Sequence, residues 1–151
     1  MKNNKIKVRL RLVIIKNNKL LAHYTQDDDF YFYIGGKLEY GETIKQGWER
    51  EILEELGDDI KFEFKKILYI RDYIKPEEGE HSVELYVLGD INKFGGVEGR
   101  PDPEFGGRKW PVWLDLDNLP DNLYPQSLSQ KLVKEYQAGF PHQGQYIGEI
   151  I

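Results

Sequence analysis

Near the start of the chain, from residue 5 to residue 14, every second side chain is hydrophobic, and the positions between them are polar as far as Arg11. An alternation of period two puts the two kinds of side chain on opposite faces of an extended backbone, so it predicts a half-buried β-strand. Asn17-Asn18 then predicts a hairpin turn, with residues 20 to 25 as the returning strand. The apolar face of the first strand carries Ile6, Val8, Leu10, Leu12 and Ile14, and its polar face carries Lys5, Lys7, Arg9 and Arg11.

A helix is predicted in the middle of the chain, after a further strand. Residues 30 to 34 form a short aromatic strand that ends at a pair of glycines, and a helix follows over residues 43 to 56. Thr43 and Gln46 have the spacing of a capping box, and Gly57 is a favourable residue for ending a helix. The sequence therefore predicts a strand, a glycine pair, a loop and a helix in that order.

The second half of the chain predicts more strands and one further helix. Residues 92 to 107 contain five glycines and two prolines, which indicates a long loop of the kind that often carries function. Strands are expected at 60–74, 82–91 and 108–114, a turn at 75–81 and a helix over 125–136, while 139–151 fits neither pattern. One mixed sheet with a helix on each face would bury all of these apolar faces, so we expect a single α/β domain over residues 1 to 151.

The composition is that of an ordinary globular protein. The chain has 151 residues, of which 40% are hydrophobic and 31% charged, and this length allows a sizeable core. No apolar run approaches the roughly 20 residues of a membrane-spanning helix, and the N-terminal segment lacks a signal-peptide pattern. Cysteine is absent, which excludes disulfides and thiolate metal sites and fits a reducing compartment. We therefore expect a cytoplasmic protein without membrane attachment.

Charge is unevenly distributed along the chain. The net charge is −5, so we expect no general attraction to nucleic acid polymers or to anionic lipid. Residues 1 to 19 nevertheless carry seven basic side chains and no acidic one, whereas residues 36 to 58 carry seven acidic and three basic side chains. Two such stretches suit a site that holds cations and polyphosphate together. Two separate solvated faces are the simpler explanation, and charge alone favours them.

Three glutamates gather on one side of the predicted central helix. Glu51, Glu54 and Glu55 fall within an arc of about 100°, because successive helical residues turn by about 100°. Acidic helix faces are usually solvated, but Glu55 borders the apolar stripe around Trp48. Partly buried carboxylates need a cation or a proton, and Arg50 alone cannot neutralise three of them. Mg²⁺ and Mn²⁺ prefer carboxylate oxygens, so the cluster is a candidate divalent-metal site.

The segment from residue 35 to residue 58 resembles the Nudix box, the signature of the Nudix hydrolase family. The glycine and charged positions of that signature are filled here, at the same spacing, by Gly36, Glu42, Arg50, Glu51, Glu54, Glu55 and Gly57. Two positions depart from the pattern, because Asp58 stands where an apolar residue is usual and Ile34 where a proline is common. Neither of the two is a proposed ligand. The resemblance implies a Nudix-like α/β/α sandwich with a mixed β-sheet between helices.

The resemblance also implies a reaction, which is hydrolysis of a nucleoside diphosphate linked to a further group. Water attacks a phosphorus of the pyrophosphate, and Mg²⁺, or Mn²⁺ in its place, supplies most of the catalysis together with positioning. The metal-binding positions of the box are filled by Glu51, Glu54, Glu55 and, through its carbonyl, Gly35. Glu51 is the first candidate for activating the water, and Arg50 and Glu42 would hold the carboxylates in place. Gly36 allows the backbone to approach the substrate closely.

Candidates outside the box have weaker support. Family members often place a further acid on a distant strand or loop, and the residues that could serve here are Glu84, Glu98, Asp102 and Glu104. Each of them is more simply explained as a surface carboxylate. Tyr31 could stack on a nucleobase or belong to the core, and Arg11 could contact phosphate or face solvent together with Arg9. Trp110 and Trp113 are predicted core residues, and the three histidines show no ligand spacing.

The sequence leaves the substrate open. Small size favours a nucleoside triphosphate, including an oxidised one, slightly over a nucleoside diphosphate sugar. The main alternative is a non-catalytic Nudix-fold domain that binds a nucleotide or sugar nucleotide, and the intact carboxylate set argues against it. The glycine pair and the apolar stripe of the helix disfavour a third hypothesis, an acidic helix that docks on a basic protein. We expect a monomer or homodimer that acts on a small-molecule nucleotide.

Overall fold

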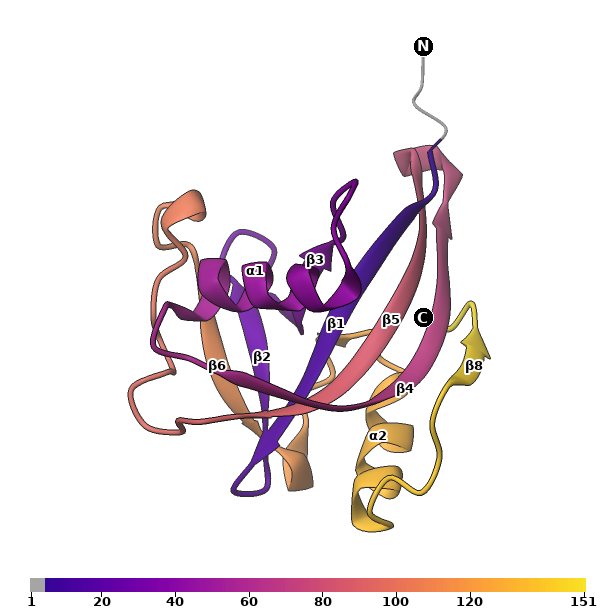
Figure 1. Ribbon diagram of the computed structural model, residues 1–151. Coiled ribbons are helices and arrows are strands. Elements are labelled where there is room, and N and C mark those ends of the chain that lie inside the picture. The colour runs from indigo at the N-terminus through magenta and orange to yellow at the C-terminus, as the bar shows by residue number, and fades with distance from the viewer. Residues whose placement is uncertain (1–4) are drawn as a thin grey trace.

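The computed structural model describes residues 5–151, which form a mixed sheet with a helix against each of its faces (Figure 1). Within them the strands lie in the order β6-β2-β3-β1-β5-β4-β8, and β7 pairs with β3. The strands are β1 (Lys7–Lys16), β2 (Lys19–Thr25), β3 (Phe30–Lys37), β4 (Phe62–Lys75), β5 (Glu80–Ile91), β6 (Lys109–Asp115), β7 (Leu123–Tyr124) and β8 (Gln145–Gly148). The helices are α1 (Ile44–Leu56) and α2 (Leu128–Gln137), and short 3-10 helices lie at η1 (Pro76–Glu78), η2 (Pro103–Phe105) and η3 (Leu116–Asn118). This is the α/β arrangement expected from the sequence.

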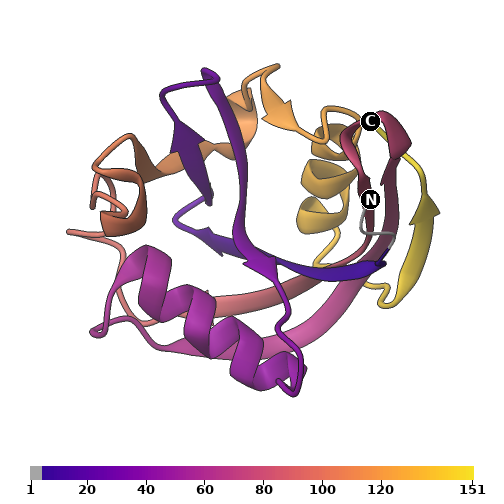
Figure 2. The same ribbon diagram turned by 90° about the horizontal axis from the view of Figure 1, so that it is seen from above.

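β1 and β3 join the two halves of the sheet. β1 runs parallel to β5 and antiparallel to β3, and its end turns through Asn17-Asn18 into β2. Both asparagines have positive φ, 53° and 60°, as a two-residue hairpin of this kind requires. β2 pairs with β6 and with the first half of β3, so β3 contributes to both halves. Seen from above, α1 and α2 lie on opposite sides of the curved strands β1, β5 and β4 (Figure 2).

Two hydrophobic cores lie on the two faces of the sheet. On one face, Leu12 of β1 packs in a cluster with Trp48 of α1 and with Trp113, which confirms the prediction that Trp113 is a core residue. On the other face, Val13 belongs to the core that α2 covers, while Trp110 is only half-buried. A strand covered on both faces buries consecutive residues, so the alternation read from the sequence describes only the face toward α1.

Several boundaries differ from the prediction. β3 continues through the glycine pair to Lys37, because these residues keep pairing with β1. α2 begins at Leu128 rather than at Pro125. β7 is not predicted, and β8 forms in the segment that fitted neither pattern; each is short and depends on pairing with a strand distant in the sequence. Ile6 is exposed, not buried, because it precedes the first paired residue of β1.

The two ends of α1 follow the signals read from the sequence. The Thr43 Oγ1 accepts the Gln46 N–H at 3.1 Å, and the Gln46 Oε1 accepts the Thr43 N–H at 2.9 Å, which confirms the capping box. Gly57 ends the helix with a φ of 107°, a value that favours glycine. Neither helix in residues 5–151 is long and apolar enough to cross a membrane.

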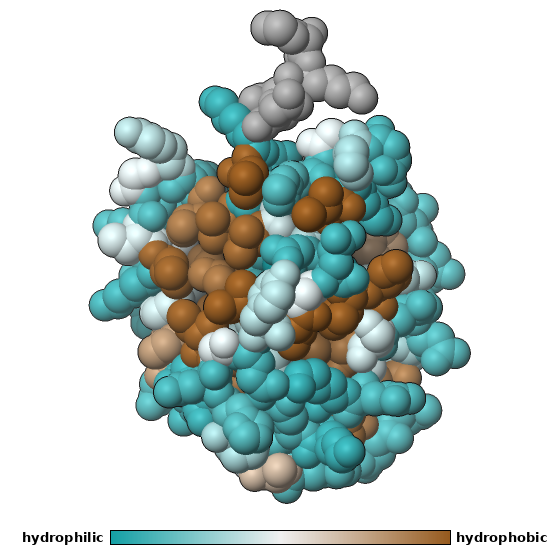
Figure 3. Space-filling model, turned by 90° about the vertical axis from the view of Figure 1, so that its right-hand side faces the viewer, coloured by the Kyte–Doolittle hydropathy of each residue, from teal (hydrophilic) through white to brown (hydrophobic). Residues whose placement is uncertain are grey.

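The edge of the sheet formed by β4 and β8 keeps some hydrophobic side chains at the surface. Figure 3 shows this side of the molecule, where hydrophobic residues are interspersed with polar ones. Phe64 and Ile74 of β4 and Tyr146 of β8 are all exposed. The Tyr146 hydroxyl donates a hydrogen bond to the Asp72 carboxylate of β4, so the short strand β8 is also held by a side chain.

Candidate functional site

A cavity of about 1340 Å³ lies where α1 meets β1, β3, β4 and β5. This volume exceeds the roughly 300–1,000 Å³ of ordinary small-molecule pockets, so it has room for a nucleotide with its phosphates. Its wall combines acidic, basic and aromatic side chains. They include Glu51, Glu54 and Glu55, then Arg9, Arg11, Arg71 and Lys109, and then Phe30, Phe32 and Phe105. The basic stretch of β1 and the acidic stretch of α1 therefore line one cavity.

Glu51 and Glu55 enter this cavity from α1 with little exposure to solvent. Glu51 is 7% exposed and the Glu55 side chain is similarly buried, whereas Glu54 is half exposed. Burial raises the pKa of Glu51 above its usual value, against the effect of its pairing with Arg50. Burial, followed by the charge of Glu51, raises the pKa of Glu55 well above its usual value. Such carboxylates are ionised more readily when a further cation is bound beside them.

Arg50 connects the acidic residues of the loop and the helix. Its Nε and Nη2 donate to the two oxygens of Glu42 at 2.7 and 2.9 Å, and this pairing lowers the pKa of Glu42 to about 2. The Nη1 donates to Glu51 at 2.9 Å and to Glu54 at 3.4 Å. The Nη2 also donates to the Lys37 carbonyl at the end of β3. Arg50 and Glu42 thus contact the carboxylate cluster as a positioning pair would.

The glycine pair brings the backbone of β3 against the carboxylates of α1. The Gly35 N–H donates to the Glu55 Oε2 at 2.9 Å. Gly35 has a φ of 134°, and a Cβ there would lie 2.0 Å from the Leu10 carbonyl oxygen, so this position requires glycine. A Cβ on Gly36 would lie 2.7 Å from the Glu51 Oε1. The contact from Gly35 to the cluster is made by its amide, whereas the sequence predicted its carbonyl.

The carboxylates fit a divalent metal in their chemistry, but they are not assembled around one. Mg²⁺ takes oxygen ligands at about 2.0–2.1 Å in near-octahedral geometry. Within the described residues, no group of three acidic, histidine or cysteine side chains stands close enough together to hold a metal ion. Arg50 pairs with Glu51 and Glu54, while Glu55 turns toward the Gly35 amide. Two buried carboxylates with raised pKa values, Glu51 held by Arg50 and Glu55 by the Gly35 amide, are nevertheless a donor set that suits such an ion.

Arg11 and Arg9 lie on the cavity wall, so of the two alternatives that the sequence left open the structure disfavours the solvated face. The Arg11 Nε donates to the Glu84 Oε2 at 3.3 Å, and its Nη1 donates to the Tyr33 carbonyl at 3.3 Å. Arg9 pairs with Glu80 at 2.8 Å and lines the same cavity. Strand periodicity correctly put both arginines on one face of β1. That face borders the cavity, where both arginines pair with glutamates of β5.

Two of the four further acids line the cavity and are buried, so they are not surface carboxylates as expected. Glu84 is 4% exposed and Asp102 is equally buried. Glu84 accepts hydrogen bonds from Arg11, from Arg71 at 2.6 Å and from the Tyr86 hydroxyl at 3.0 Å. Burial opposes its ionisation, but the charges of Arg11 and Arg71 outweigh burial and hold the pKa of Glu84 below its usual value. Because its pKa is lowered, Glu84 is a weak base. Its carboxylate holds the guanidinium groups of Arg11 and Arg71 in place.

The other two acids belong to the long loop between β5 and β6. Glu98 is exposed, lies outside the cavity lining and accepts a backbone N–H from β6 at 2.9 Å. The side chain of Glu104 lies outside the described part of the structure. Arg100 donates to the Leu56 carbonyl at 2.7 Å and so ties this loop to the C-terminal end of α1. The loop thereby carries Asp102 into the cavity.

Tyr31 lies away from the cavity, so the structure corrects its predicted place in a binding site. Its neighbours Phe30 and Phe32 line the cavity, whereas the Tyr31 ring packs on Tyr24 with centroids 4.9 Å apart and borders the core under α2. Successive side chains of a strand point to opposite faces of the sheet. Phe32 therefore faces the cavity and can stack on a ligand, whereas its neighbour Tyr31 faces the other side. The aromatic role considered for Tyr31 suits Phe32 instead.

Lys109 of β6 adds a positive charge to this aromatic wall. Its Nζ lies 3.6 Å from the centroid of the Phe105 ring and 5.6 Å from that of Phe32, as cation–π contacts do. Phe105 comes from the long loop and Phe32 from β3. Three elements that are distant in the sequence therefore build a surface suited to a flat, electron-rich group.

His23 is a residue of this cavity that the sequence analysis missed. It lies in the middle of β2 and is 1% exposed, and its Nδ1 stands 3.6 Å from the Glu55 Oε1. Burial, together with the charges of Lys109 and Arg11, lowers the pKa of His23 to about 4, so the ring is neutral at pH 7. No local spacing signals this histidine, because its neighbours come from α1, β1 and β6.

A curated relative supports the resemblance found in the Nudix box. The NAD-capped RNA hydrolase NudC of Vibrio atlanticus (strain LGP32) is 28% identical over 126 residues. The match covers 82% of this chain and 43% of that protein, so this chain spans less than half the length of the curated relative.

Solved structures and a family model support the same resemblance. A MutT NUDIX hydrolase from Burkholderia pseudomallei has a TM-score of 0.68 at 26% identity, covering 84% of this chain and 97% of that one. An ADP-ribose pyrophosphatase from Streptococcus suis 89-1591 has a TM-score of 0.65 at 20% identity, covering 93% of this chain and 97% of that one, which shows a shared fold alone. The NUDIX domain model matches residues 7–135. With the box intact around the cavity, this match shows that the chain belongs to the Nudix family.

Proposed function

We propose that the protein hydrolyses a pyrophosphate bond in a nucleoside diphosphate derivative and that Mg²⁺ is its cofactor. The observation that carries this proposal is that Glu51, Glu54 and Glu55 of the Nudix box lie on the wall of a cavity that also holds arginines and aromatic rings. Anionic phosphates, a divalent cation and a flat base need these three kinds of side chain together. The names of two relatives, an NAD-capped RNA hydrolase and a MutT NUDIX hydrolase, agree with hydrolysis.

Each group of side chains has a defined part in this reaction. Glu51, Glu54 and Glu55 would hold the metal, which when bound polarises the phosphoryl oxygens and a water molecule. Glu51 would accept the proton of the water whose oxygen attacks phosphorus. The bond from phosphorus to the bridging oxygen breaks, and the leaving phosphate keeps its electron pair. Arg11 would contact phosphate oxygens and Phe32 would stack on the base, because both line the cavity.

A screen of nucleotides tests the proposal directly. The purified protein would be incubated with nucleoside triphosphates, their oxidised forms and nucleoside diphosphate sugars, and release of phosphate or pyrophosphate would be measured. We expect hydrolysis with Mg²⁺ or Mn²⁺ and none with a chelator. If a nucleotide binds but is not hydrolysed with either metal, the protein is instead a binding domain of the Nudix fold.

Metal binding should stabilise the folded protein through Glu55. A ligand present at 100 times its dissociation constant adds about 2.7 kcal/mol to the free energy of unfolding, so Mg²⁺ should raise the melting temperature. Glu55→Gln removes the charge of a buried carboxylate and should abolish most of that shift, as thermal unfolding can show. Glu49→Gln is the matched control, because Glu49 is on the same helix but exposed to solvent. A full Mg²⁺-dependent shift in Glu55→Gln would rule out this ligand assignment.

Gly36→Ala should disturb Glu51 more than it disturbs the fold. The added methyl group would press on the far end of a flexible side chain, so the free energy of unfolding should change by less than about 1 kcal/mol. A shift of about 1 Å in a reacting group costs roughly 10²-fold in rate, so kcat should fall by about 10- to 100-fold. Urea unfolding and steady-state kinetics measure the two effects. Gly95→Ala is the control, since nothing lies within 4 Å of a Cβ there. Equal kcat values in the two variants would contradict the prediction.

A further inference from the structure

His23 is a buried polar side chain whose hydrogen-bonding capacity is unused. Neither its Nδ1 nor its Nε2 has a hydrogen-bond partner within the described residues, although both atoms are shielded from solvent. Buried polar atoms are nearly always hydrogen-bonded, and leaving one unpaired costs about 1–3 kcal/mol. An imidazole kept in the centre of a strand at this cost requires an explanation in terms of the neighbouring site.

The neighbour of His23 is the carboxylate of Glu55. The Nδ1 lies 3.6 Å from the Oε1 of Glu55, slightly beyond hydrogen-bonding distance, while the Oε2 of Glu55 already accepts the Gly35 N–H at 2.9 Å. No arginine or lysine within the described residues pairs with Glu55. The nearby Arg50 forms its ion pairs with Glu42, Glu51 and Glu54 instead. Glu55 is therefore flanked by a backbone amide on one oxygen and an imidazole on the other.

The acceptor that the Nδ1 of His23 faces is the Glu55 carboxylate, because the other groups around the ring are apolar or positively charged. The ring lies edge-on to Phe32 with centroids 5.3 Å apart, so β3 offers it an apolar neighbour. Arg11 of β1 and Lys109 of β6 add only positive charge. In sites without ligand, hydrogen bonds of the reacting groups are often long and shorten only when the site is loaded.

We propose that His23 is a positioning residue whose Nδ1–H donates to the Glu55 Oε1 and sets the orientation of this carboxylate toward the metal. This inference rests on the metal site of the proposed function and adds to it a residue outside the Nudix box. Groups that hydrogen-bond to metal ligands usually change metal affinity by about 10- to 100-fold when they are removed. A histidine that only fills space would have no such effect.

A matched pair of variants separates the effect of the N–H donor on metal binding from the effect of side-chain volume. Asparagine and leucine are similar in size, so His23→Asn and His23→Leu leave comparable space, but only asparagine carries an N–H near the position of Nδ1. The probe is Mn²⁺ alone, titrated calorimetrically into the protein without nucleotide. We expect His23→Leu to bind Mn²⁺ about 10- to 100-fold more weakly than the unaltered protein, and His23→Asn to bind it at least about tenfold more tightly than His23→Leu. Equal Mn²⁺ affinities in the two variants would overturn the proposal.

A second measurement uses the unaltered protein, in case either variant folds poorly. Nitrogen-15 NMR distinguishes the two neutral tautomers of histidine, and the spectra of His81→Asn and His142→Asn identify the His23 signals by elimination, because the chain has three histidines. We expect the tautomer protonated at Nδ1 when Mg²⁺ is present, and the tautomer protonated at Nε2 would overturn the proposal. Failure of the parent protein to bind Mn²⁺ would overturn it too. A parent that binds Mn²⁺ but hydrolyses no nucleotide would overturn the proposed function alone.

Discussion

Glu51→Gln should lower kcat for nucleotide hydrolysis by about 10²- to 10⁴-fold, which is the usual contribution of a positioned general base. The change keeps the size of the side chain and removes its charge. Glu51 lies within 2.9 Å of Arg50, and the position of Gly36 leaves just enough room for its carboxylate. The loss should be larger if the metal is bound less tightly as well. Steady-state kinetics at saturating Mg²⁺ measures the effect, with Glu49→Gln as the exposed control on the same helix.

The acids outside the box provide the decisive comparison for Glu51. Asp102→Asn, Glu84→Gln, Glu98→Gln and Glu104→Gln should be measured beside it. Asp102 is the strongest competitor among those whose side chains are described, because it is buried on the cavity wall, whereas Glu84 is held by Arg11 and Arg71 and Glu98 is exposed. If Glu51→Gln keeps near-full turnover while Asp102→Asn loses it, the base lies outside the box and Glu51 is at most a dispensable ligand.

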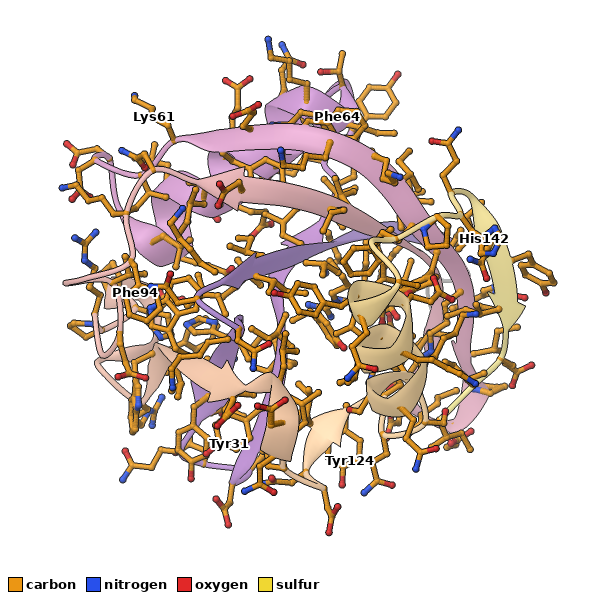
Figure 4. The ribbon with its side chains drawn as sticks, turned by 90° about the horizontal axis from the view of Figure 1, so that it is seen from below. Tyr31, Lys61, Phe64, Phe94, Tyr124 and His142 are labelled. Carbon is orange, nitrogen blue, oxygen red and sulfur yellow. The ribbon has the colours of Figure 1, made fainter. Side chains whose placement is uncertain are left out.

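Trp48→Ala should reduce the free energy of unfolding by about 3–5 kcal/mol, as truncation of a buried tryptophan usually does. Trp48 is 9% exposed and belongs to the core between α1 and the sheet. Its ring stacks on Phe64 with centroids 5.1 Å apart and an interplanar angle of 4°, and it also contacts Phe62 at 5.7 Å. Figure 4 shows Phe64 on β4 at the side of the molecule where α1 lies. The urea midpoint is the quantity to measure.

Trp48→Phe is the matched control for this prediction. It keeps an aromatic ring against Phe64 and removes less volume, so its loss of stability should be clearly smaller than that of Trp48→Ala. Nucleotide hydrolysis at low temperature, where both variants are folded, should stay near the parent level. An unchanged urea midpoint together with lost activity would show that Trp48 faces the substrate instead of the core.

Local patterns were sufficient for much of the fold. The strands near the N-terminus, the Asn17-Asn18 turn and the capped helix α1 all follow from side-chain periodicity and from residues that act on their own backbone. The same holds for the carboxylate cluster, because Glu51, Glu54 and Glu55 are brought together by one helix whose geometry is set locally. Elements that depend on a distant partner, such as β7 and β8, were not predictable in this way.

The sequence by itself determined the family resemblance, the acidic helix and the glycine pair beside it. Only the tertiary structure decided which other side chains share the cavity: His23 from β2, Glu84 from β5, Asp102 from the long loop, and Phe32 in place of Tyr31. The physical reason is that these residues meet across paired strands, where the register and the face turned toward the cavity depend on the whole sheet. A helix specifies its own neighbours within a few residues, whereas a strand acquires them from segments that the local sequence does not identify.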